Sequence, residues 1–143
     1  MRDANPGRPN LRRGLAYGAA LALPFVAFWA VAEAILDFGA GLIVVAAIAG
    51  WLTGTAVALG AEPGSLRRAR STLRLAVAVC LAIWPVAIVA AYLLSRFILQ
   101  GSDLTFLERI ASTPIVEYVG PQFLPVGPLE LAALAGFGWL GAR

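Results

Sequence analysis

The sequence contains no histidine and no lysine, and Cys80 is its single cysteine. One cysteine excludes an intramolecular disulfide, and the absence of histidine excludes the Cys/His clusters that bind structural zinc. It also excludes histidine as an acid–base catalyst or as a haem ligand. Because Cys80 lies within an apolar run, we interpret it as a small buried hydrophobic residue.

Charge is scarce as well. Charged residues make up 13% of the 143 residues and hydrophobic residues 60%, with a mean hydropathy of +0.82. Ordinary soluble domains carry about 25% charged residues, so this composition predicts transmembrane helices within a single domain. All eleven basic residues are arginine, and the chain is rich in Ala, Gly and Pro. We interpret this as GC-rich coding and expect a bacterial cytoplasmic (inner) membrane protein that binds no nucleic acid.

Catalytic motifs are missing too. The chain has no glycine-rich nucleotide loop, no nucleophile elbow and no metal-ligand spacing. We therefore expect a protein that is not an enzyme and that binds no cofactor and no metal.

The sequence does contain a stretch of 24 uncharged residues, 38–61, which is long enough to cross a bilayer core of about 30 Å as a helix. Within it, small residues recur at every fourth position: Ala46, Gly50, Gly54 and Ala58. This GxxxG-type spacing forms a groove on one helix face, where another helix can pack closely within the membrane. We expect the preceding helix, its hairpin partner, to occupy the groove.

The whole pattern predicts an all-α membrane domain over 1–143, with four transmembrane helices in two antiparallel hairpins. The predicted spans are 14–36, 40–60, 73–99 and 126–142, with a cytoplasmic arm at 1–13 and an outer loop at 102–125. A cleaved signal peptide is an alternative for the first span, although its apolar run is longer than usual for one. A re-entrant or surface segment is an alternative for the short last span, although Pro128 and Glu130 favour a helix start there.

The outer loop has a helical pattern of its own. Ser102 and Asp103 can cap a short helix that Pro114 would end, and Leu104 and Leu107 share one face of it. This pattern suits a helix in the membrane interface, with an irregular loop as the alternative. The proline-rich residues 115–128 are expected to be extended.

Arginine placement orients the chain. With a cytoplasmic N-terminus, nine arginines lie on the cytoplasmic side and two, Arg96 and Arg109, lie outside. The positive-inside rule therefore predicts that both termini are cytoplasmic. Four of the nine form a cluster that we expect to fix the topology and to contact anionic lipid headgroups: Arg67, Arg68, Arg70 and Arg74.

Two carboxylates, Glu33 and Asp37, share a helix face near the outer end of the first span. Arg96 lies at a similar height in the third span, because Pro24 and Pro85 mark comparable depths. We predict that Arg96 pairs with Glu33 or Asp37. A proton or cation site at the two acids is the alternative.

Trp51 and Trp84 lie at mid-depth rather than at the membrane interface. This position favours packing within the protein, with contact to a bound lipid or pigment as the alternative.

These observations favour an accessory or scaffold subunit of a larger membrane complex, which contacts the bilayer and packs against other transmembrane subunits or against itself. The alternative is a small transporter or channel that uses Glu33 and Asp37 at its outer mouth. Such a protein could act as a homo-oligomer.

The predicted topology can be tested by thiol labelling in intact cells. A cysteine introduced at Ser102 should react with a membrane-impermeant reagent, and one introduced at Ser65 should not, because they lie on opposite sides. Cys80 should stay unlabelled and serves as the internal control. The reverse pattern would overturn the predicted orientation.

Overall fold

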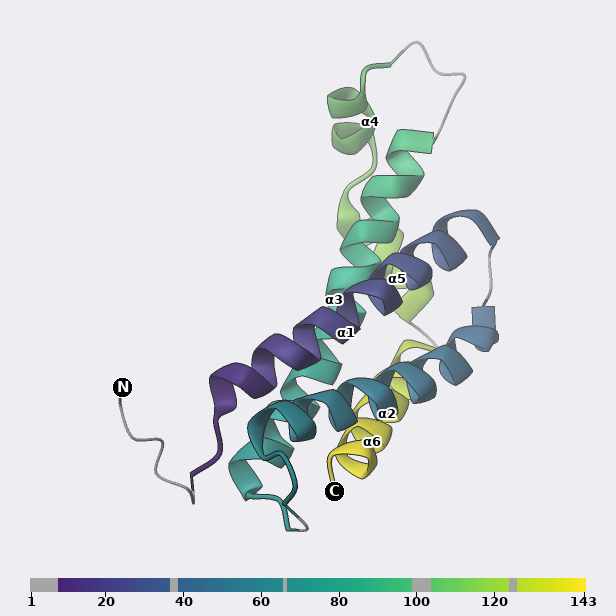
Figure 1. Cartoon of the computed structure of the whole chain (residues 1–143). Helices are drawn as coiled ribbons and strands as arrows, with labels where there is room; N and C mark the ends of the chain where they lie inside the picture. Colours follow the sequence, from purple (N-terminus) through teal and green to yellow (C-terminus); the bar gives the residue numbers. More distant parts are fainter. Residues whose placement is uncertain (1–7, 37–38, 66, 99–103, 124–125) are drawn as a thin grey trace.

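The computed structural model describes residues 8–36, 39–65, 67–98, 104–123 and 126–143, and these segments contain helices and connections but no strand (Figure 1). Three helical stretches are long and apolar enough to cross a membrane. They are α1, Leu11–Val31, with its continuation to Leu36; α2, Leu42–Ala61; and α3, Arg70–Ile98. The prediction of a helical multi-pass membrane protein is therefore confirmed.

The first predicted span, 14–36, begins and ends close to the observed helix. Asn10 caps α1 by accepting a hydrogen bond from the Arg13 backbone N–H at 3.1 Å. The helix passes through Pro24 and continues as a π-helical turn, η1, over Ala32–Leu36. A short 3₁₀ turn, η2, over Gly39–Gly41 then leads into α2.

The connection from α2 to α3 is held by Glu62. Its carboxylate accepts a hydrogen bond from the Ala69 backbone N–H at 3.0 Å, and its carbonyl oxygen accepts one from the Arg68 side chain. Gly64 has φ +76°, a left-handed conformation that favours glycine. These contacts let α3 begin at Arg70, three residues before the predicted start at 73.

Two short helices, α4 over Phe106–Ser112 and α5 over Ile115–Phe123, follow α3. The expectation of an extended segment over 115–128 was wrong as far as 123. Pro114 accepts the first hydrogen bond of α5, from Glu117, and Val119 packs against the buried core. Proline is tolerated at a helix start, and this packing outweighs the hydrogen bond that Pro121 cannot make.

Helix α4 is capped by Thr105 rather than by Ser102 and Asp103, which lie outside the described residues. The Glu108 backbone N–H bonds to the Thr105 hydroxyl at 3.4 Å, and the Thr105 N–H donates to the Glu108 carboxylate at 2.7 Å. This is a capping box. The backbone bond, followed by the Thr105 hydroxyl, lowers the pKa of Glu108, so the cap weakens as pH falls through that lowered pKa.

Helix α4 is attached to the end of α3 by Tyr92. Its hydroxyl donates to the Thr113 carbonyl oxygen at 2.8 Å and lies 3.1 Å from that of Ile110. The rings of Phe97 and Phe106 also meet edge to face, with centroids 6.4 Å apart. Helix α3 is the longest helix and extends beyond α1 and α2 to reach α4 (Figure 1).

The last helix, α6 over Gly127–Ala142, occupies the groove of α2. A methyl group added to Gly50 would lie 2.7 Å from the Leu134 carbonyl oxygen, and one added to Gly54 would overlap Gly138. The expectation that α1 fills this groove was therefore wrong. The residue numbers increase together along this contact, so α6 runs parallel to α2.

Helix α1 packs on a second set of small residues near the end of α2. Gly60 lies against the backbone of Arg13 and Gly14, and Gly18 lies beside Val57. The spacing of small residues in α2 predicts that helices can pack closely on it. It does not predict which helix packs on which face. Both α1 and α6 carry glycines that allow a close approach.

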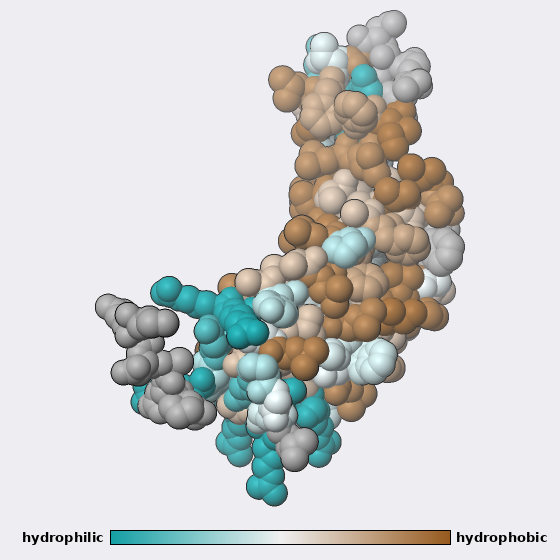
Figure 2. All heavy atoms as spheres, in the orientation of Figure 1, coloured by the Kyte–Doolittle hydropathy of each residue, from teal (hydrophilic) through white to brown (hydrophobic). Residues whose placement is uncertain are grey.

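The surface is hydrophilic at one end of the molecule and mainly hydrophobic over the rest. Hydrophilic side chains gather at the end that holds the start of α1 and the α2–α3 connection, and hydrophobic side chains cover most of the rest (Figure 2). Inside, Cys80 is fully buried and its sulfur lies 3.5 Å from the Gly50 carbonyl oxygen. The interpretation of Cys80 as a small buried residue is confirmed.

Two alanine substitutions in α6 test the close contact. Gly138→Ala would place a methyl group 2.6 Å from the Cys80 sulfur, so it should destabilise the fold by about 1–3 kcal/mol in thermal unfolding in detergent. Gly136→Ala meets nothing within 4 Å and should leave stability unchanged or raise it by about 1 kcal/mol, since alanine favours helices. Equal effects of the two would contradict the packing described here.

Candidate functional site

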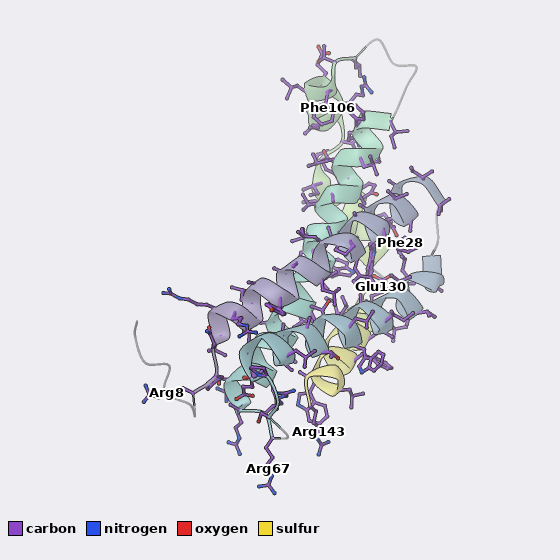
Figure 3. The ribbon with its side chains drawn as sticks, viewed as in Figure 1. Arg8, Phe28, Arg67, Phe106, Glu130 and Arg143 are labelled. Carbon is purple, nitrogen blue, oxygen red and sulfur yellow. The ribbon has the colours of Figure 1, made fainter. Side chains whose placement is uncertain are left out.

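Glu130 is the one charged residue buried among the residues that the structure describes, with 5% of its surface exposed. It lies in the first turn of α6, and its carboxylate accepts a hydrogen bond of 2.8 Å from the indole N–H of Trp84 in α3. In Figure 3, Glu130 lies inside the bundle, away from the labelled arginines Arg8, Arg67 and Arg143. A buried acid within apolar helices is costly unless its oxygens are hydrogen-bonded, and such acids are functional candidates.

A second tryptophan belongs to the same buried cluster. Trp29 of α1 has no exposed surface, and its indole N–H has no acceptor among the described residues. It lies in the last turn of α1, just before the π-helical turn η1, a type of distortion that is frequent at functional sites. Polar groups from α1, α3 and α6 thus lie in the buried interior. They are the indole N–H groups of Trp29 and Trp84 and the carboxylate of Glu130.

The sequence pattern assigns Glu130 only to a helix start. That assignment is correct, because Pro128 and Glu130 do lie in the first turn of α6. The burial of Glu130 was missed because the sequence does not show that α3 covers this turn. The available signal was a lone carboxylate in an otherwise uncharged segment, 126–142.

The four small residues of the predicted groove are all buried: Ala46, Gly50, Gly54 and Ala58. Next to them, the Thr55 hydroxyl bonds to the Trp51 carbonyl oxygen at 2.9 Å and lies 3.1 Å from that of Gly141 in α6. The groove therefore combines close backbone contact with a polar contact between the same two helices.

Arg96, which the sequence predicts to pair with Glu33 or Asp37, has two other contacts in the structure. Arg96 donates to the Thr113 hydroxyl at 3.4 Å and lies over the Tyr92 ring, 5.6 Å from its centroid. Glu33 is half-buried in η1, and its pairing with Arg96 stays a prediction. Tyr92 belongs to α3 itself, and Thr113 lies in the link between α4 and α5. Asp37 lies outside the described residues, so its pairing with Arg96 stays a prediction.

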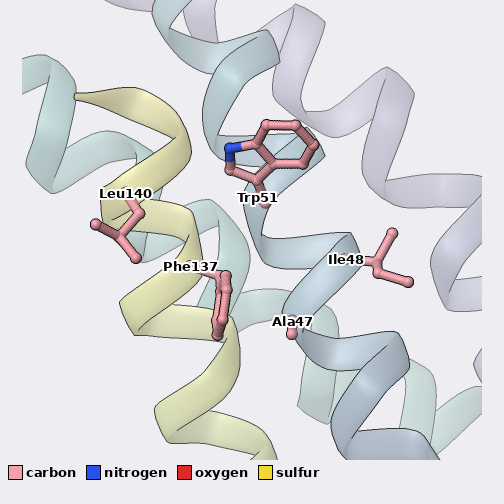
Figure 4. A pocket seen from close by; sticks show the side chains of 5 residues that line it. All are labelled: Ala47, Ile48, Trp51, Phe137 and Leu140. Atoms are coloured by element: carbon pink, nitrogen blue, oxygen red, sulfur yellow. The ribbon is translucent and has the colours of Figure 1, made fainter.

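Trp51 does not pack in the core, contrary to the interpretation from its depth. Its side chain is 54% exposed, whereas Trp84 is 8% exposed. Trp51 lines an open apolar pocket of about 240 Å³ with residues of α2 and α6 (Figure 4): Ala47, Ile48, Phe137 and Leu140. We call this surface the Trp51 groove.

The arginine cluster divides into residues with different surroundings. Arg67 is exposed, and Arg68 is engaged with the carbonyl oxygen of Glu62. Arg70 and Arg74 line a pocket between α3 and the end of α6.

Comparison with known proteins adds no assignment, because the chain matches no family model, no curated protein and no solved structure. In the described part of the chain, no three acidic or cysteine side chains come together as a metal site would require. The site must therefore be interpreted from its own geometry.

A double-mutant cycle tests the link between Glu130 and Trp84. Glu130→Ala removes the carboxylate to which the buried indole N–H of Trp84 donates, and it should cost about 1–3 kcal/mol in thermal unfolding. Glu130→Gln keeps an acceptor oxygen and should cost less. Together with Trp84→Phe, Glu130→Ala should show a coupling of about 0.5–3 kcal/mol, whereas additive effects would contradict the hydrogen bond.

Proposed function

We propose that the protein is a non-enzymatic subunit or scaffold of a membrane protein assembly, and that the Trp51 groove is the surface that contacts its partner. The partner we expect is a transmembrane helix of another subunit. The observation that carries this proposal is the exposure of Trp51 on α2.

Trp51 is the tenth of the twenty residues of α2, so it lies near mid-depth if this helix crosses the bilayer. Tryptophan favours the membrane interface, where its N–H can be hydrogen-bonded, and the hydrocarbon core offers no acceptor. The indole N–H of Trp51 bonds to none of the described residues. A partner helix can supply both an acceptor and a packing surface, which lipid tails cannot.

The neighbours of Trp51 support a helix as the occupant. Ile48 is 48% exposed, Phe137 is 44% exposed and Leu140 is 53% exposed, and they surround Trp51 from two adjacent helices. Large aromatic side chains in an apolar groove are typical anchors of protein contacts. Ala47 leaves room at the floor of the groove for a partner side chain.

We further propose that α6 is a fourth, short span. Its 16 residues give about 24 Å of helix, less than a bilayer core of about 30 Å. In support, α6 runs parallel to α2, as the four-span topology requires, and Arg143 lies 5.1 Å from the Trp139 ring at its end. In this arrangement both termini are cytoplasmic and α4, with Leu107 76% exposed, lies at the outer interface.

Site-specific photocrosslinking in native membranes tests the proposed contact. A photoreactive residue at Ile48, Trp51 or Phe137 should give a discrete crosslinked protein, because these side chains line the groove. The same residue at Leu23 or Val86, which are 66% and 52% exposed on other helices, should give lipid adducts only.

Equal crosslinking at the groove and control positions would contradict the proposal. The alternative, a small transporter or channel that uses Glu33 and Asp37, would instead be favoured by flux in liposomes that falls in Glu33→Gln.

A further inference from the structure

A pocket of about 420 Å³ lies between the start of α3 and the end of α6. Arg70 and Arg74 line one end of it, and Val77, Ala78 and Leu81 continue the wall along α3, with Trp139 of α6 also in the lining. These positions of α3 recur every three or four residues, so they share one helix face. That face changes from charged to apolar over 11 residues, or about 16 Å.

The two arginines of the pocket have no anionic partner among the residues that the structure describes. The guanidinium groups of Arg70 and Arg74 bond to none of the described residues, whereas Arg68 is engaged by Glu62. The nearby Glu62 carboxylate accepts from the Ala69 N–H and contributes to the cap of α3. The positive end of the α3 dipole adds to the attraction for an anion at this place.

The position of the pocket along the membrane normal suits a bound lipid. Helix α3 is long and apolar enough to span a membrane, and Arg70 is its first residue, so the charged end lies at the level of headgroups. Trp139 lines the pocket, and Arg143 lies over its ring at 5.1 Å. Aromatic and basic side chains are common at this level of the bilayer.

A ligand for this pocket needs an anionic group at one end and an apolar chain of several carbons. Free phosphate or a soluble phosphorylated compound would leave the wall formed by Val77, Ala78 and Leu81 in contact with nothing apolar. We propose that the pocket binds one anionic phospholipid, with its phosphate at Arg70 and Arg74 and an acyl chain along that wall. This inference is independent of the proposed function, because it concerns another face of the bundle.

Native mass spectrometry of the full chain in detergent tests the site. Phosphatidylglycerol and phosphatidylcholine with the same chains are titrated, and the wild type should retain one phosphatidylglycerol in preference to phosphatidylcholine. Arg70→Gln with Arg74→Gln should weaken phosphatidylglycerol binding about 30-fold, about 2 kcal/mol for two arginines.

A matched control removes the same charge elsewhere. Arg8 and Arg12 are exposed and do not line this pocket, so Arg8→Gln with Arg12→Gln should leave binding within about twofold. Equal losses in both double variants would show diffuse surface attraction and would overturn the site.

Two further measurements separate a lipid from a simple anion. Ala78→Phe fills the apolar wall with both arginines intact, and it should abolish retention of the lipid while the thermal unfolding midpoint is monitored. Inorganic phosphate at millimolar concentration should not displace the lipid. Displacement by phosphate would overturn the lipid assignment. If Ala78→Phe does not fold, the arginine double variants decide between a bound lipid and no site.

Discussion

The contact between α2 and α6 is the interaction on which the rest of the bundle depends. Lipid tails are as apolar as the helices, so burial of hydrophobic surface does not drive helices together within a membrane. Close approach of backbones does, and it is possible only where side chains are small. Gly50 and Gly54 of α2 and Gly138 of α6 meet in this way, with no room for a methyl group at any of the three.

This close approach determines where the polar groups of the core lie. Because α6 lies directly on α2, the Gly141 carbonyl oxygen lies 3.1 Å from the Thr55 hydroxyl. The same position of α6 brings Glu130 against Trp84 of α3. The buried acid, the exposed Trp51 groove and the Arg70–Arg74 pocket all border α6, so one short helix shapes each candidate site.

The long helices could be predicted from the sequence because their signal is local. Uncharged runs and flanking charges located α1 with its continuation η1, α2 and α3 to within about three residues. Partners could not be predicted, because they depend on contacts between distant segments. The groove of α2 was recognised but assigned the wrong occupant, and Trp51 was expected to be buried. The contact of Arg96 with Thr113 was not predicted.

The α5 helix also depends on a contact between distant segments that its local sequence does not predict. The prolines at 121, 125 and 128 favour an extended chain locally, yet Val119 packs against the core and residues Ile115–Phe123 are helical. Glu130 is the most informative case. Its residue type, its helix and its turn were all recognised, but its burial depends on α3, which lies more than thirty residues away in the sequence.

The parallel pairing of α2 with α6 has a consequence for biogenesis. Thr55 and Gly141, which meet across this contact, are 86 residues apart in the chain. At about 5–20 residues per second, a ribosome needs on the order of ten seconds to make the segment between them. During that interval the glycine face of α2 has no partner from its own chain, so the nascent protein presents to the translocation machinery the surface that its own C-terminal helix later covers.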